Sequence, residues 1–252
     1  MSFDFRQALH LPQLRKGSGQ GDADPYELPR QRRGTTPQMH GRYPDYDVLE
    51  NAKHWDEATR AKVLPRVNGV PPVRFFDPRE AATVEALTNL LTAQDSEPRI
   101  PVLNFVDEKL FKGEGEGYQY FDMPDDRETW RRVARGLDEE AEARASVSSF
   151  AAASGAVQYD IVSDFADAKL FGGTWGTFNV KHAFSVVMQD VLSSFYSHPW
   201  AWNEIGYGGP AYPRGYVRFG NPQLQPGETE TWEAPEAFDV DPVTGRRETP
   251  PS

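Results

Sequence analysis

Apolar residues recur at spacings of three and four through the middle of the chain, which is typical of amphipathic helices. No run of alternating apolar and polar positions is bounded by the turn residues that a β-hairpin needs. The sequence therefore predicts an all-α fold of about five packed helices. The expected helices span approximately 77–93, 101–112, 127–152, 157–170 and 178–196.

Two of these helices carry sequence signals for their ends. Asp77, Pro78 and Glu80 place an N-cap acid before a proline at the first helical position and an acid at the third. This combination predicts that a helix begins at Pro78. Ser154 and Gly155 are expected to end the longest helix, because glycine commonly follows a helix C-terminus.

A segment of unusual composition follows the last of these helices. His198–Tyr216 contains two Trp, three Tyr, four Gly and three Pro residues in the order HPWAWNEIGYGGPAYPRGY. Proline removes backbone donors and glycine allows dihedral angles that other residues avoid. The segment is therefore expected to form a long, non-repetitive loop whose large aromatic side chains need an apolar cover. That cover is either the rest of this chain or a partner.

The chain is expected to have three parts. Residues 1–70 read as an extended N-terminal arm with one helix at about 47–63, residues 71–220 as the all-α domain, and residues 221–252 as an acidic, proline-rich tail. Residues 1–42 carry seven basic and four acidic groups, whereas the tail carries two basic and seven acidic groups. Such oppositely charged ends are either arms that bind the surface of another molecule or disordered ends that are simply solvated.

Composition excludes several classes of function. The formal net charge of −11 argues against nucleic acid as a partner, because phosphate binding needs clustered Lys and Arg. The chain has no cysteine, so disulfides, thiolate metal sites and cysteine nucleophiles are excluded. No apolar run reaches the roughly 18 residues of a membrane span. The N-terminal residues lack an export signal, so we expect a cytoplasmic protein.

Few side chains suggest chemistry. No two of the five histidines have metal-ligand spacing with a nearby carboxylate, so no metal site is expected. The GEGEG run at 113–117 lacks the lysine and preceding strand of a phosphate loop, and is expected to be a surface turn. His198 is expected to satisfy carbonyls at a helix end. Glu204 lies among aromatic residues, where it acts as an acid with a raised pKa or pairs with Arg214.

The segment HPWAWNEIGYGGPAYPRGY, following a helix that ends VLSSFYS, resembles the gluconate 2-dehydrogenase subunit 3 family. Earlier pieces agree in order: the helix over Pro78–Leu91, the helix VLNFVDEKL, the turn GEGYQYF and the long helix from Trp130. The resemblance covers roughly Phe75–Gly220, and the aromatic segment is its specific part.

This resemblance implies a small subunit without a cofactor of its own. In such complexes a large subunit of the glucose-methanol-choline type holds FAD and oxidises sugars, sugar acids or related polyols, while the small subunit binds it and supports its maturation or stability. Several members also carry a twin-arginine export signal. The N-terminal arm of this chain shows none, which favours a cytoplasmic heterodimer.

Independently of the resemblance, the composition of residues 198–220 fits a partner contact. Protein interfaces are enriched in Trp, Tyr and Arg and depleted of Lys, as this segment is. The expected contact residues are Trp200, Trp202, Asn203, Tyr207, Tyr212, Arg214, Tyr216 and Arg218. Alternatively the aromatic side chains cover this chain's own helices. Two further functions stay open: a small hydrolase or isomerase using Glu204, assisted by Asn203 or His198, and a structural module that self-associates through the segment.

Overall fold

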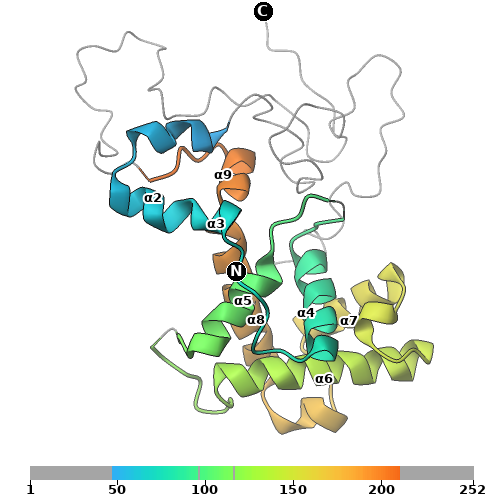
Figure 1. Ribbon diagram of the computed structural model, residues 1–252. Coiled ribbons are helices and arrows are strands. Elements are labelled where there is room, and N and C mark those ends of the chain that lie inside the picture. Colours follow the sequence, from blue (N-terminus) through green and yellow to red (C-terminus); the bar gives the residue numbers. More distant parts are fainter. Residues whose placement is uncertain (1–46, 96, 116, 211–252) are drawn as a thin grey trace, which may run out of the picture. The chain divides into compact units, whose positions relative to one another are not determined.

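The computed structural model describes residues 47–210 apart from 96 and 116 (Figure 1). The described chain is helical and contains no strand, which confirms the predicted all-α fold. Residues 1–46 of the predicted arm, the last ten residues of the predicted domain and the whole predicted tail, 221–252, lie outside the described range. The elements are η2 (Val48–His54), α2 (Glu57–Val63), α3 (Pro65–Asn68), α4 (Pro78–Leu91), α5 (Val102–Lys112), α6 (Asp126–Ala145), η3 (Phe150–Ala152), α7 (Gly155–Ala166), η4 (Gly173–Thr177), α8 (Val180–Tyr196) and α9 (Pro199–Ile205), where η marks a 3₁₀-helix.

The described residues form two compact units. The first unit comprises 71–93 and 101–195, and therefore contains α4 to α7 and nearly all of α8. The second unit comprises 47–70, 94–100 and 196–210, which include η2, α2, α3 and α9. Residues 196–210, expected in one domain with the preceding helices, thus share a unit with the segment 47–70 that we assigned to the N-terminal arm.

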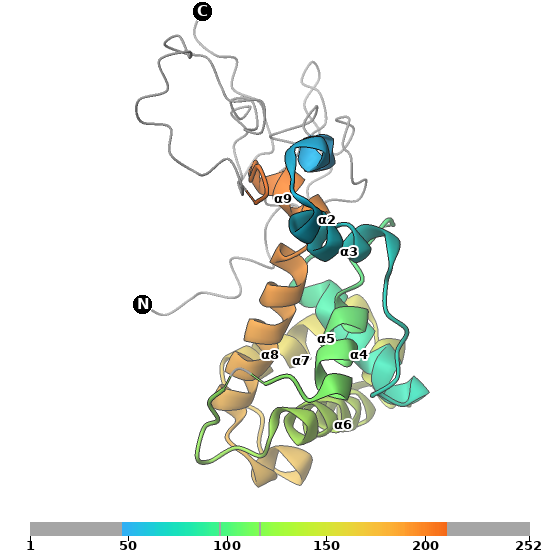
Figure 2. The ribbon, with the colours of Figure 1, turned by 60° about the vertical axis from the view of Figure 1, so that its left-hand side comes forward.

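The core of the first unit is built around α6. This helix contacts α4, α7, η3 and η4, and both ribbon views show it running below α4 and α5 (Figures 1 and 2). Its apolar stripe of Trp130, Val133 and Leu137 is fully buried, as the helical spacing predicts. On α5, Val106 and Leu110 are also buried. The sequence pattern therefore identified the core-facing sides of these helices.

Helix ends in the first unit confirm one predicted signal and correct another. Asp77 and Glu80 form the expected capping box at the start of α4. The longest helix, however, ends at its C-cap Ser146, whose φ of 54° is left-handed, and not at Ser154. Ser154 instead caps the start of α7 by accepting a hydrogen bond from the backbone N–H of Val157. The same residue type serves either purpose, so the sequence signal was ambiguous.

Buried carboxylates connect segments of the first unit. Asp107 on α5 is fully buried and accepts hydrogen bonds from the backbone N–H groups of Arg74–Phe76 at 2.7–2.9 Å. Asp138 on α6 accepts hydrogen bonds from Thr83 Oγ1 and Arg79 Nε on α4, both at 2.7 Å. Because an unmet buried acceptor is costly, these contacts fix the approach to α4 and its packing on α6.

The second unit has an apolar cluster of its own. The expected single helix over 47–63 is two elements, η2 and α2, because Trp55 is extended at the end of the first and Asp56 caps the second by accepting from Thr59 N. The short helix α3 follows α2. The buried members of the cluster are Val48, Trp55, Val63 and Trp202.

Candidate functional site

Part of the aromatic segment is a helix, which corrects the prediction that all of it is irregular. Its first residues form α9, with His198 as the N-cap, Pro199 at the first helical position and Gly206 at the C-terminal end. The φ of Gly206 is 66°, a conformation that glycine adopts without strain. Proline and glycine therefore bound a helical turn here, as they do at many helix ends.

Two of the expected partner-contact residues are buried inside the second unit. Trp202 is 6% exposed and Asn203 is 4% exposed. The indole Nε1 of Trp202 donates to the carbonyl of Tyr196 at 2.6 Å, and Asn203 Oδ1 accepts from Val48 N at 2.7 Å. These two side chains hold segments of the second unit together, and partner contact through them stays a prediction.

The other expected contact residues divide into two groups. Trp200 is half-buried, and Tyr207 is 37% exposed, so both reach the surface of the second unit. Partner contact through them stays a prediction. The remaining four, Tyr212, Arg214, Tyr216 and Arg218, lie outside the described residues.

His198 has a structural position. Its ring is 1% exposed, with Nδ1 accepting from Trp200 N at 3.2 Å and Nε2 lying 3.0 Å from the carbonyl oxygen of Arg66. Because Nδ1 accepts, Nε2 carries the proton and donates to that carbonyl. The expectation that His198 satisfies a helix carbonyl is confirmed, although the carbonyl belongs to α3 and not to the preceding helix.

Glu204 lies within the second unit at 7% exposure. Its expected ion-pair partner, Arg214, is outside the described residues. The carboxylate influences a neighbour: burial raises the pKa of the Tyr196 hydroxyl, and the negative charge of Glu204 raises it further. Glu204 thus belongs to the interior of this unit.

A second aromatic cluster lies in the first unit, in a segment the sequence analysis treated as a surface turn. We call Tyr118–Asp122, which connects α5 to α6, the aromatic loop. The side chain of Phe121 is 99% exposed and that of Tyr118 is 60% exposed. Large apolar side chains normally bury part of their surface, so an aromatic ring entirely in solvent is informative.

The aromatic loop is held against the start of α8 by His182. The rings of Tyr120 and His182 are stacked, with centroids 4.0 Å apart and planes 9° from parallel. His182 Nδ1 lies 2.8 Å from Asp122 Oδ1, and Asn179 Nδ2 donates to Asp122 Oδ2 at 2.7 Å. These hydrogen bonds, that from His182 first, lower the pKa of the Asp122 carboxyl.

The pairing of His182 with a carboxylate limits what the imidazole can do. With Nδ1–H donating to Asp122, Nε2 is left as an acceptor, an arrangement found at metal sites and general bases. The described residues contain no group of three metal-ligating side chains. His182 is therefore suited to accepting a hydrogen bond and supporting the ring of Tyr120.

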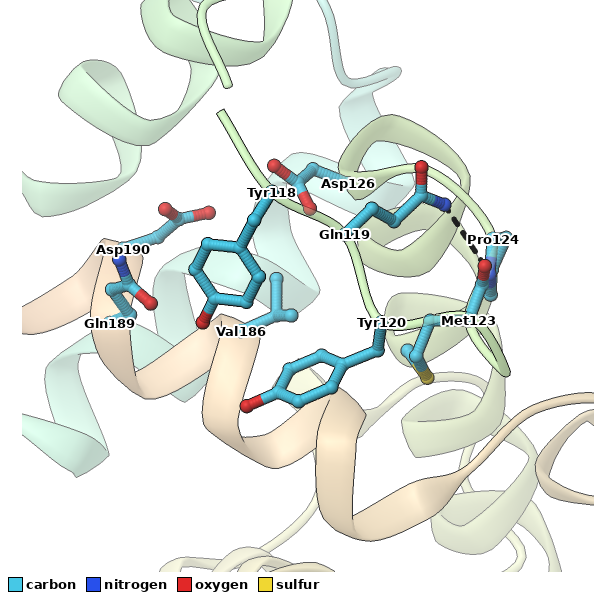
Figure 3. A pocket seen from close by; sticks show the side chains of 9 residues that line it. All are labelled: Tyr118, Gln119, Tyr120, Met123, Pro124, Asp126, Val186, Gln189 and Asp190. Carbon is cyan, nitrogen blue, oxygen red and sulfur yellow. Dashed lines mark hydrogen bonds between the residues drawn. The ribbon is translucent and has the colours of Figure 1, made fainter. Parts of the chain in front are cut away.

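The hollows beside the aromatic loop are of two kinds. A cavity of about 20 Å³ lies between the loop and α8, where Figure 3 shows the rings of Tyr118 and Tyr120 beside Val186 and Gln189. It has room for one water molecule and none for a sugar or flavin. An open depression of about 370 Å³ runs along residues 113–115 and 117–119 to the start of α6. Both adjoin the same loop.

A buried ion pair lies behind these hollows. Asp190 on α8 is 3% exposed, and its Oδ1 accepts from Lys109 Nζ on α5 at 2.6 Å. Its Oδ2 accepts from Trp130 Nε1 on α6 at 2.8 Å. One carboxylate therefore joins three helices that carry or flank the aromatic loop.

In the comparison with protein families, the model described as gluconate 2-dehydrogenase subunit 3 matches residues 78–209, from the start of α4 to just beyond α9. The chain belongs to the gluconate 2-dehydrogenase subunit 3 family. This confirms the resemblance seen in the sequence. Neither the curated proteins nor the solved structures gave a match.

The residues matched by the gluconate 2-dehydrogenase subunit 3 family model include both aromatic clusters. The matched range includes the aromatic loop and α9, and it excludes η2 and α2, whose Val48 and Val63 belong to the same apolar cluster as Trp202. No helix in the described part of this subunit 3 family member is long and apolar enough to cross a membrane.

Sequence reasoning missed the exposed ring of Phe121 and its support by His182. The sequence YQYF, with three aromatic residues in four positions, was the available signal. The neighbours of Phe121 are held by residues about 60 positions away, as in the contact between Asp122 and His182. Sequence spacing does not reveal such contacts.

Proposed function

We propose that this chain is a non-catalytic small subunit that binds, and stabilises or matures, a large FAD-dependent dehydrogenase of the glucose-methanol-choline type. The large subunit oxidises a sugar or sugar acid and holds the FAD. The observation that carries the proposal is the match to the subunit 3 family over residues 78–209. We further propose that the two chains form a cytoplasmic hetero-oligomer.

The geometry supports a binding role over the alternative of a small hydrolase or isomerase. That alternative gave Glu204 the catalytic role, with Asn203 or His198 assisting. Asn203 and His198 are at most 4% exposed, and both hydrogen-bond to backbone groups of the second unit. Side chains committed to the fold in this way are poorly placed to meet a substrate.

Co-expression tests the proposal. A large FAD-dependent dehydrogenase subunit of the glucose-methanol-choline type from the same organism is produced alone and together with the full-length chain, and its solubility, bound FAD and sugar-dependent reduction of an artificial acceptor are measured. We expect all three to rise when both chains are present. Equal values in the two preparations would contradict the accessory role.

A second arm of this experiment addresses the enzyme alternative. The full-length chain is purified by itself and assayed for turnover, with Glu204→Gln as the comparison. We expect no turnover from the wild-type chain, because the chemistry belongs to the flavoprotein. A wild-type activity that the substitution abolishes would favour the enzyme.

A further inference from the structure

Phe121 is the most exposed of the large apolar side chains in the described part of the chain, at 99%. Tyr118, three residues earlier, is 60% exposed, and its ring packs edge-to-face on Tyr120 with centroids 5.7 Å apart. Aromatic side chains that project from a folded surface are the usual anchors of protein–protein interfaces. The aromatic loop therefore has the composition and exposure of a docking site.

The backbone on both sides of Phe121 is held in place. On one side, Tyr120 stacks on His182 and its carbonyl accepts from Met123 N at 3.1 Å. On the other side, Asp122 accepts from His182, and the buried Met123 accepts a hydrogen bond from Gln119 Nε2 at 2.9 Å. An anchor presented by a fixed loop loses little conformational entropy when it is bound.

The charge around the aromatic loop indicates the chemistry of its partner. The sequence from Gly113 to Glu128 carries six acidic residues and one basic residue, Arg127. This negative surface, with exposed ring faces, attracts Arg and Lys side chains. It repels nucleic acid and anionic lipid, whose charges are also negative. A symmetric contact between two copies of the chain would bring the exposed carboxylates of Glu114 and Asp125 towards those of the other copy, which disfavours a second copy.

From these observations we propose that the large dehydrogenase subunit docks on the aromatic loop, with Phe121 entering an apolar pocket that has a basic rim. This inference rests on the proposed function, and it moves the main contact away from α9. Two of the residues expected to make that contact, Trp202 and Asn203, are buried in the second unit.

The chain offers a matched control for Phe121. Phe171, between α7 and η4, is 87% exposed and also belongs to the first unit. Its sequence neighbours from Asp167 to Gly173 include one acidic and one basic residue, so it lacks the acidic surround of the aromatic loop. Phe121→Ala and Phe171→Ala remove the same group from similarly exposed positions, and neither is expected to disturb folding.

Binding of the full-length chain to the purified large flavoprotein is measured by calorimetry for the wild type and both variants. Phe121→Ala is expected to raise Kd about 30-fold or more, as loss of an interface anchor does, whereas Phe171→Ala changes Kd by less than about threefold. Glu114→Lys, an exposed charge reversal beside the loop, is expected to slow association and weaken its dependence on salt.

The outcomes separate this inference from the proposed function. If the wild-type chain does not bind the flavoprotein, the proposed function is wrong. If the wild type binds and Phe121→Ala binds equally well, or if both alanine variants lose affinity equally, the docking site is wrong although the function stands. Self-association that Phe121→Ala abolishes, seen by sedimentation of the chain alone, would assign the loop to a second copy and overturn the inference.

Discussion

Removing one member of the buried pair Lys109–Asp190 is expected to destabilise the first unit strongly. Asp190 is 3% exposed and Lys109 is 19% exposed by side chain, so most of the pair is shielded from water. Removing one charge of such a pair leaves the other uncompensated and costs about 3–5 kcal/mol. We expect Lys109→Met to fall in this range, and Asp190→Asn near its lower limit, because Lys109 keeps some contact with water.

The double variant gives the sharper result. Lys109→Met combined with Asp190→Asn removes both charges, while the amide oxygen still accepts the hydrogen bond from Trp130 Nε1. The cost of the double variant is therefore expected to be smaller than the sum of the single costs, by about 2 kcal/mol or more. Asp190→Asn alone also keeps that acceptor. Comparing this single variant with the double variant therefore isolates the effect of the unpaired charge of Lys109.

Urea unfolding followed by circular dichroism measures these costs. The exposed pair Lys169–Asp167, whose side chains are 55% and 39% exposed, is the control, and Lys169→Met is expected to change stability by less than about 0.5 kcal/mol. Single costs below about 1 kcal/mol, or a double variant whose cost equals the sum, would refute the reasoning that a buried charge pair joins α5, α6 and α8.

Two further predictions concern the other unit and the aromatic loop. Asn203→Ala leaves the buried Val48 N–H without its acceptor and should lower the free energy of unfolding by about 1–3 kcal/mol in urea titrations; an unchanged midpoint would contradict the position given to Asn203. Because the hydrogen bond from His182 lowers the pKa of Asp122, this carboxylate stabilises the fold above its unfolded pKa, and the stabilisation is lost as pH falls through the lower folded pKa. Thermal melts of the wild type and Asp122→Ala should therefore differ at about pH 6, begin to converge below about pH 4 and coincide only below the folded pKa, and a difference that persists there would exclude this source.

Local signals in the sequence predicted much of the first unit. The capping box at Asp77 and the apolar stripe of α6 depend on residues within a few positions of one another, so the sequence alone sufficed for them. The end of the longest helix was missed because Ser146 closes it in a left-handed conformation without glycine. In α9, proline was taken as a loop residue although it stands at the first helical position.

Contacts between distant residues account for what the sequence did not predict. Trp202 looked like an interface residue, but it belongs to an apolar cluster with Val48, Trp55 and Val63, more than a hundred positions earlier. Asp190 carries no local sequence signal of its burial, because its partners lie on α5 and α6. Composition shows that aromatic and charged residues are present, and only the packing shows which of them remain at the surface.

Light scattering coupled to size-exclusion chromatography tests the central claim most directly. The purified full-length chain and the purified large flavoprotein are mixed, and the mass and flavin absorbance of each peak are recorded. For the wild-type chain we expect one peak that carries the flavin and whose mass is the sum of both chains. With Phe121→Ala we expect this peak to give way to separate peaks of the two chains. Two separate peaks with the wild-type chain, each at the mass of its own chain, would contradict the claim.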